Sequence, residues 1–306
     1  MSEDVNLVQL VCRIRLESDV ADPYLLYSIR SHFPLLFRQA VGCRQDNCAN
    51  CAVFAECPWD RTFGQRISPD PDAVRRFQKP PLPFVFDIPL LPATQNRGAI
   101  VELGLTLVGS AIAHLPFYLK AVSGLCVATG IKRPILPVSI LSVGCRDASG
   151  AIAPLPSPVP EVFPEGVTIL TAAELAASRQ LSPSSLVLEI DTPLRLMQEG
   201  RPARSLVFSQ IARTLLRRVS AISYYYGDVE STLDYKWLSK SSEEIDTAEY
   251  ALEWREWPGN NGGLVGSLAF TGDLSEFHSF LALGEVLHLG KGASYGMGRY
   301  RVLEGG

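Results

Sequence analysis

The chain has 306 residues, which is long enough for two domains of ordinary size, each with its own hydrophobic core. Hydrophobic residues make up 47% of it, but the longest apolar run, from Leu103 to Leu119, is interrupted by glycine, serine, histidine and proline, so no membrane span is expected. The formal net charge of −4 excludes a uniformly basic nucleic-acid binder, and any nucleic-acid contact must depend on local charge. Because Glu3 and Asp4 open the chain with acid where a secretory signal needs base, we expect a cytoplasmic protein.

Hydrophobic periodicity in the first half predicts a strand, a helix, two strands, a helix and a strand. The strand 6–16 alternates apolar with polar residues, and the helix that follows, from Asp22-Pro23 to Phe37, is expected to kink or end at Pro34. The other elements of this half are expected at 83–91, 99–108, 110–127 and 135–144. This order predicts a first domain over residues 1–150.

A proline-rich connector, 151–182, follows the first half. The same order of elements then recurs, with Ser205 as the expected N-cap of its first helix, at 185–191, 205–223, 251–257, 264–271, 275–289 and 299–303. Two copies of β-α-β-β-α-β predict an α+β protein with two tandem ferredoxin-like domains, 1–150 and 183–306.

The last helix and the last strand are joined by a glycine-rich loop, 290–298, whose four glycines are Gly290, Gly292, Gly296 and Gly298. Glycine takes positive φ and lets a ligand approach backbone N–H groups, so these glycines and Lys291 predict an anion cradle. The spacing fits neither the P-loop nor the dinucleotide fingerprint. A helix C-cap turn without a ligand is the alternative, but it explains one glycine well and four poorly.

Further candidates for binding a sugar-phosphate chain lie in and near this loop. Arg299 follows the loop, and Tyr295 within it could stack on a base or pack behind the loop. Six arginines and one acid lie between Arg195 and Arg218. Arg213 and Arg217 in this segment are four residues apart on a predicted helix, so they project together and could hold phosphates, the alternative being a solvated helix face.

Four of the seven cysteines lie together in an insertion at 43–60, in the pattern Cys43-x4-Cys48-x2-Cys51-x5-Cys57-Pro58. Disulfides are unusual in a cytosolic chain, so the spacing predicts a metal site. Structural zinc held by four thiolates is the first interpretation, and an iron–sulfur cluster is the second. Reduced thiols, or disulfides formed during purification, are the alternative.

These features resemble those of the CRISPR repeat-processing endoribonucleases of the repeat-associated mysterious protein (RAMP) superfamily. The loop 290–298 carries the resemblance, and shorter segments support it in the right order along the chain: 76–84, 107–111, 191–196, 217–220 and the cysteine segment. The resemblance implies tandem ferredoxin-like domains and a precursor CRISPR RNA as substrate, with other subunits of a CRISPR effector complex as further partners. It places the chain in antiviral defence.

The resemblance also implies a metal-independent cleavage in which a ribose 2′-hydroxyl attacks the adjacent phosphate, leaving a 2′,3′-cyclic phosphate and a 5′-hydroxyl. This reaction needs a base, an acid and a cation near the phosphate. His32 lies where many relatives carry their catalytic histidine and is the first candidate, with plain helix surface as the alternative. Lys291 could stabilise the pentacovalent phosphate.

Three functions are consistent with the sequence. The first is an endoribonuclease that cleaves a CRISPR repeat, and the second is a non-catalytic RNA-binding subunit of an interference complex. Both predict RNA at the glycine-rich loop, but only the first needs a proton donor such as His32. The third is a metal-sensing or redox-sensing protein, which leaves the loop unexplained.

Overall fold

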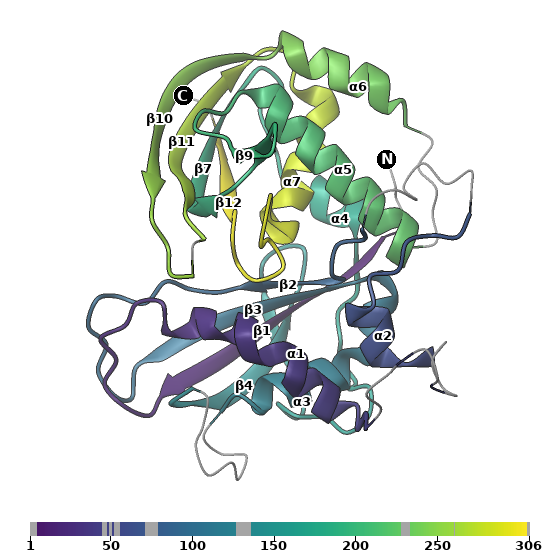
Figure 1. Cartoon of the computed structure of the whole chain (residues 1–306), viewed down its shortest axis with the longest axis vertical. Helices are drawn as coiled ribbons and strands as arrows, with labels where there is room; N and C mark the ends of the chain where they lie inside the picture. The colour runs from purple at the N-terminus through teal and green to yellow at the C-terminus, as the bar shows by residue number, and fades with distance from the viewer. Residues whose placement is uncertain are drawn as a thin grey trace. The chain divides into compact units, whose positions relative to one another are not determined.

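The computed structural model describes residues 5–44, 48, 51, 56–70, 79–126, 136–227, 233–259 and 261–304 (Figure 1). The chain forms a mixed α/β protein with antiparallel sheets and divides into two compact units. The N-terminal unit spans Leu7–Ile169, and the C-terminal unit begins at Leu170 and also includes Val5 and Asn6. The expected connector 151–182 is shared between them, and its role as a separate linker stays a prediction.

The N-terminal unit has an antiparallel sheet in the strand order β2-β3-β1-β4-β5. Its elements in chain order are β1 (Asn6–Leu16), the 3-10 helix η1 (Leu25–Ser28), α1 (Ile29–Ala40), α2 (Pro58–Phe63), β2 (Phe84–Asp87), β3 (Ile100–Val108), the 3-10 helix η4 (Gly109–His114), α3 (Leu115–Ser123), β4 (Val138–Arg146) and β5 (Ile152–Pro154).

Two prolines of this unit lie in helices. Pro34 lies inside α1 without ending it. The single helix expected at 110–127 is instead η4 followed by α3, and Pro116 lies in the first turn of α3. A proline is tolerated there because the N–H groups of a helix's first turn have no partner within the helix.

An aromatic cluster in the core fixes α1 against its neighbours. The Phe33 ring from α1 meets Phe86 of β2 edge-on at a centroid distance of 4.9 Å, and Phe37 meets Tyr118 of α3 at 4.7 Å. These side chains are fully buried. The cluster therefore sets the position of α1 and of every residue on its surface.

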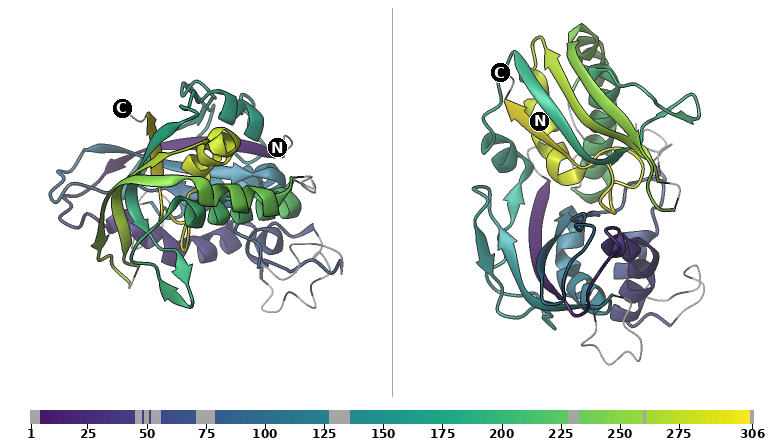
Figure 2. Two further views of the ribbon diagram at one scale, coloured as in Figure 1. Left: turned by 90° about the horizontal axis from the view of Figure 1, so that it is seen from above. Right: turned by 90° about the vertical axis from the view of Figure 1, so that its left-hand side faces the viewer.

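The C-terminal unit has a second antiparallel sheet, in the order β10-β11-β7-β12. Its elements are β6 (Leu170–Thr171), α4 (Ala172–Ala177), β7 (Ser185–Leu194), β8 (Met197–Gln198), β9 (Arg201–Pro202), α5 (Phe208–Tyr226), α6 (Tyr235–Ser241), the 3-10 helix η6 (Ser242–Glu244), β10 (Asp246–Arg255), β11 (Gly263–Thr271), the 3-10 helix η7 (Ser275–Phe277), α7 (His278–Leu287) and β12 (Tyr300–Glu304). The helices α5 and α7 cover one face of this sheet (Figure 2).

The boundaries of α5 correct the expected N-cap at Ser205. The helix begins at Phe208, and its N-cap is Val207, whose N–H donates to Oε1 of Gln210 at 3.2 Å. A glutamine one turn into the helix thus replaces the serine hydroxyl as the partner of a terminal N–H group.

The last strand, β12, lies at an edge of the sheet and is bound there by side chains. The Val302 N–H donates to Oε1 of Glu285 at 2.9 Å, and Arg179 donates both to Glu285 at 2.8 Å and to the Val302 carbonyl at 3.3 Å. Tyr300 is buried, and its hydroxyl donates to the Leu281 carbonyl of α7 at 2.9 Å. These contacts fix the strand on which the glycine-rich loop ends.

Within the described part of the chain, no helix is both long enough and apolar enough to cross a membrane.

Candidate functional site

All four glycines of the loop 290–298 have positive φ: 78° at Gly290, 87° at Gly292, 83° at Gly296 and 65° at Gly298. Residues that carry a side chain rarely adopt this backbone conformation. At Gly298 a Cβ atom would also overlap the carbonyl oxygen of Leu289. The backbone of this loop therefore requires glycine.

The end of β7 and the residues after it hold the loop through backbone hydrogen bonds. The Lys291 N–H donates to the Arg195 carbonyl at 3.0 Å, and the Gly298 N–H donates to the Pro193 carbonyl at 3.1 Å. Within the loop, the Leu289 N–H donates to the Gly298 carbonyl at 3.0 Å and closes its base. These hydrogen bonds fix the loop to the rest of the C-terminal unit.

The tip of the loop combines backbone donors with an exposed cation. In the described residues, the N–H groups of Gly292, Ala293 and Ser294 have no hydrogen-bond partner, although Ala293 and Ser294 are buried residues. Lys291 is exposed, and its ammonium group has no carboxylate partner in the same described part of the chain. Consecutive N–H groups of this kind beside a lysine can bind an anion such as phosphate.

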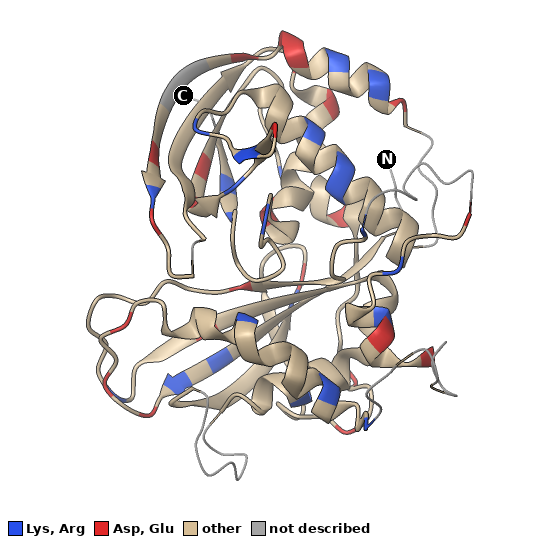
Figure 3. Cartoon of the chain, viewed as in Figure 1, with Lys and Arg blue, Asp and Glu red and all other residues tan. Residues whose placement is uncertain are grey.

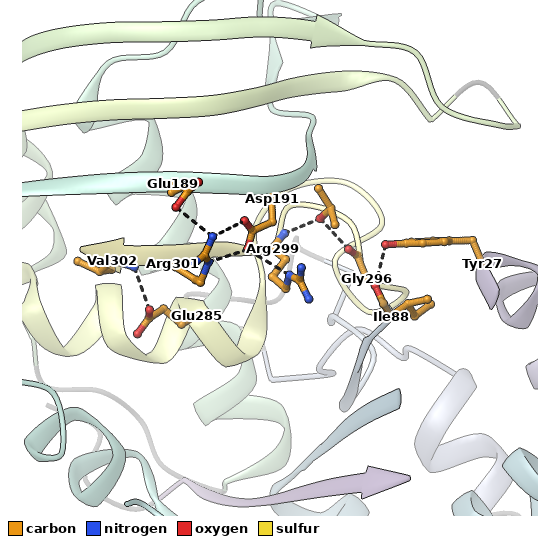
Figure 4. Close-up of polar contacts among 10 residues, drawn as sticks. Tyr27, Ile88, Glu189, Asp191, Glu285, Gly296, Arg299, Arg301 and Val302 are labelled. Carbon is orange, nitrogen blue, oxygen red and sulfur yellow. Dashed lines mark hydrogen bonds and ion pairs between the residues drawn. The ribbon is translucent and has the colours of Figure 1, made fainter. Parts of the chain in front are cut away.

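Arg299, a predicted RNA contact, is paired with Asp191 of β7, with 3.4 Å between Nε and Oδ2 (Figure 4). Arg301, two residues further along the chain in β12, bonds both carboxylate oxygens of Asp191, at 3.0 and 3.1 Å, and Glu189 at 3.0 Å. The hydrogen bond to Asp191 raises the pKa of Arg301. Asp191 thus compensates two cations that an RNA phosphate would otherwise meet.

The sequence contained no signal for this role of Asp191. It belongs to one of the segments that carried the family resemblance, but its partners lie more than a hundred residues further along the chain. Tyr295 is half-buried in the loop, an environment that fits either stacking on a base or packing behind the loop.

The two arginines predicted on α5 lie in different surroundings. Arg213 is half-buried and bonded to Ser239 at 2.8 Å and to Glu243. Arg217 is exposed, with its Nε donating to the Arg213 carbonyl at 3.3 Å. Basic residues recur along the visible surfaces of α5 and α6 (Figure 3). Arg217 is therefore the better placed of the pair to meet phosphate.

His32 lies on α1, next to the buried Phe33, and is half-buried. Its Nδ1 is 2.9 Å from the Ser28 carbonyl. A carbonyl only accepts, so Nδ1 carries the proton of the neutral ring and Nε2 keeps a lone pair. The turn before α1 is anchored by Tyr27, whose hydroxyl donates to the Ile88 carbonyl at 2.9 Å (Figure 4). His32 therefore presents a basic nitrogen in a defined orientation.

Each of the other three histidines has a ring nitrogen that is buried or hydrogen-bonded to the backbone. His278 has its Nε2 3.0 Å from the Ser182 carbonyl. His288 is buried and ends α7 with a φ of 54°. His114 has a buried Nε2 with no hydrogen-bond partner among the described residues, and burial, with a smaller contribution from Arg61, lowers its pKa.

The described residues do not support the predicted metal site. Cys43, Cys48, Cys51 and Cys57 are all half-buried, and in the described part of the chain no three His, Cys, Asp or Glu side chains gather into a group that could hold a metal ion. Much of the segment between them lies outside the described residues. By contrast, Cys12, Cys126 and Cys145 are buried in the core, and burial raises the pKa of Cys12 and of Cys126 to about 12.

Residues 188–300 match the family model described as CRISPR-associated endoribonuclease Cas6, and residues 7–150 match a second model described only as an N-terminal domain. No curated protein matches the chain. Among solved structures, the chain is similar to Thermus thermophilus Cas6, with 14% identity and a TM-score of 0.56 over 98% of this chain and 99% of that one.

Two further structures are similar to the chain. One is a Cas6 in a substrate mimic complex, with 16% identity and a TM-score of 0.52 over 97% of this chain and 99% of that one. The other is a chain of a partial Cas6-RT-Cas1–Cas2 complex, with 11% identity and a TM-score of 0.58. This match covers 99% of the present chain and 47% of the longer one. At these identities the likeness shows a shared fold.

Proposed function

Because the chain belongs to the Cas6 family of CRISPR-associated endoribonucleases, we propose that it binds a repeat in a CRISPR precursor transcript and cleaves it once. The observation that carries the proposal is the tip of the glycine-rich loop, where three N–H groups lie beside the exposed Lys291. Such a tip fits the phosphate of an RNA backbone.

The proposal includes a fold of two tandem ferredoxin-like domains. The strand orders β2-β3-β1-β4 and β10-β11-β7-β12 support it, because both units arrange a β-α-β-β-α-β series of elements in the same way. The glycine-rich loop joins the last helix and last strand of the second unit.

The proposed reaction is attack by a ribose 2′-oxygen on the adjacent phosphorus. The P–O5′ bond breaks, and the products are a 2′,3′-cyclic phosphate and a 5′-hydroxyl. His32 is proposed to take the 2′-hydroxyl proton at Nε2 or to return a proton to the 5′-oxygen, since a histidine serves either role near neutral pH. Lys291 would stabilise the additional negative charge of the pentacovalent phosphate. The reaction as proposed needs no metal.

The proposed partners are the precursor RNA and other subunits of a CRISPR complex. Two similar structures support this: one is a Cas6 substrate mimic complex, and the other a Cas6-RT-Cas1–Cas2 complex. Zinc or an iron–sulfur cluster at the four cysteines is a separate proposal that only their spacing supports. Elemental analysis of the purified protein, with Cys48→Ser and Cys51→Ser as controls, would test it.

The test of function is incubation of the chain with end-labelled repeat RNA in EDTA. We expect one cut that ends in a cyclic phosphate, and no cut when the ribose 5′ to the mapped site lacks its 2′-hydroxyl. Binding without cutting would favour the non-catalytic RNA-binding subunit. Bound iron together with no RNA affinity would favour the sensing function, and no binding to any repeat would contradict both RNA functions.

A further inference from the structure

We propose that Thr192 is a positioning residue that holds the glycine-rich loop in the form that binds RNA. The inference rests on the proposed function and adds a residue outside the loop to the RNA-binding apparatus. Thr192 lies in β7 and is 2% exposed. A side chain so far buried does not reach RNA, so its effect must pass through the loop.

The hydroxyl of Thr192 joins two backbone groups of the loop's second half. It donates to the Gly296 carbonyl at 2.8 Å and accepts from the Arg299 N–H at 2.8 Å. Figure 4 shows the Gly296 and Arg299 ends of these two bonds. One hydroxyl therefore fixes both ends of the turn 296–299.

The contribution of Thr192 differs from that of its neighbours in β7. Pro193 and Arg195 hold the loop through their carbonyl groups, which any residue at those positions would supply. Thr192 holds the loop through its side-chain hydroxyl, so its contribution is lost when the residue at position 192 has no hydroxyl.

Fixing the Gly296 carbonyl has a direct electrostatic consequence. A glycine with a φ of 83° has no Cβ to restrict rotation of its peptide group. Without the hydroxyl, the Gly296–Met297 peptide group would be held only by the long hydrogen bond from the Met297 N–H to the Gly292 carbonyl at 3.4 Å. A Gly296 carbonyl oxygen that turned toward a bound phosphate would repel it. The Arg299 N–H would at the same time lose its acceptor inside the loop.

The same two-residue segment also controls the guanidinium group of Arg299. Asp191, next to Thr192, pairs with Arg299 through its side chain, while its own N–H donates to the Arg299 carbonyl at 2.9 Å. Thr192 therefore fixes the backbone position of Arg299, and Asp191 fixes the position of the Arg299 guanidinium group. Loss of the hydroxyl should disturb RNA binding more than it disturbs cleavage of RNA already bound.

The test compares Thr192→Val, which keeps the shape but removes both hydrogen bonds, with Thr192→Ser, which restores the hydroxyl. Thr192→Ala is measured alongside, because it removes the hydroxyl without placing a methyl group against the loop. The matched control is Thr62→Val, since Thr62 is another buried threonine, bonded to the Tyr118 hydroxyl at 3.1 Å in the other unit.

We expect Thr192→Val and Thr192→Ala to raise the Kd for repeat RNA about tenfold, the size of effect that loss of one or two hydrogen bonds produces. The single-turnover cleavage rate at saturating RNA should change less than about threefold, and Thr192→Ser should restore the Kd. Thr62→Val should lower the Tm without changing the Kd. Wild-type affinity in both Thr192→Val and Thr192→Ala would overturn the inference, as would an equal loss of affinity in Thr62→Val. Failure of the wild-type chain to bind RNA would instead contradict the proposed function.

Discussion

The glycine-rich loop and the helix that carries His32 are held by different kinds of contact. The loop depends on residues about a hundred positions earlier in the sequence, at the end of β7 and just after it. The ring of His32 is oriented by a carbonyl one helical turn earlier, on the chain's own backbone. The conformation of the glycine-rich loop therefore depends on tertiary contacts, whereas the candidate catalytic group, His32, is oriented by local structure. Substitutions should therefore separate the two regions, one affecting the cleavage step and the other affecting affinity.

The largest expected effect is that of His32→Ala on cleavage. General acid or base catalysis contributes about 10²- to 10⁴-fold, so the single-turnover rate should fall at least a hundredfold while the Kd for repeat RNA stays within about twofold. Quenched time courses at saturating RNA, paired with a filter-binding assay, measure both. His278→Ala removes a histidine of the other unit and should cleave at the wild-type rate. A wild-type rate in His32→Ala would remove the histidine from the mechanism.

The next effect is that of Gly298→Ala on affinity. The new Cβ would overlap the Leu289 carbonyl and would force a residue with a φ of 65° into strain. We expect the Kd to rise more than tenfold. Gly150→Ala is the matched control, because Gly150 has a φ of 89° but no atom within 4 Å of the added Cβ. Equal losses of affinity in the two variants would show that the loop geometry has no special role.

Lys291→Gln should have a smaller effect that depends on salt. If this ammonium group contacts one phosphate, its loss should make the slope of log K against log salt shallower by about 0.7, the value for one contact on a single strand. Titrations at several salt concentrations measure the slope. Lys291→Arg keeps the charge and should keep the slope, and an unchanged slope in Lys291→Gln would argue against a phosphate at this position.

The smallest expected effect is the difference in RNA affinity between the variants Arg217→Ala and Arg213→Ala. The exposed Arg217 should contribute a few-fold to RNA affinity and little to the Tm. Arg213 is bonded to Ser239 and Glu243, so its loss should lower stability by less than about 1 kcal/mol and change affinity less. The reverse ranking of the two affinities would mean that Arg213 leaves its ion pair when RNA binds.

Much of the fold could be predicted from periodicity because the strands and helices are amphipathic. The strand 6–16 was predicted with its observed ends, since apolar residues recur at every second position from Val8 to Leu16. The errors occurred where tertiary context decides. Pro116 lies in the first turn of α3, which begins at Leu115 where a continuous helix was expected, and a glutamine takes the place of the predicted serine cap at α5.

The candidate site could be predicted only where a feature depends on the type of a single residue. Positive φ at the loop glycines follows from glycine's lack of a side chain, and the structure confirms it. Pairing between Arg299 and Asp191, or between Arg213 and Glu243, depends on residues brought together by the sheet and by helix packing. No spacing in the sequence contains that information, so charge counting overestimated the number of arginines available to RNA.

The binding of β12 by Glu285 and Arg179 has a consequence for self-association. An edge strand with unpaired backbone groups is a template on which a strand of another molecule can add, and this is a common route to aggregation. At Val302 both the N–H and the carbonyl are already taken by side chains of the same unit. The strand that follows the glycine-rich loop is thereby blocked against intermolecular β-pairing at its centre, so this edge is a poor template for polymerisation.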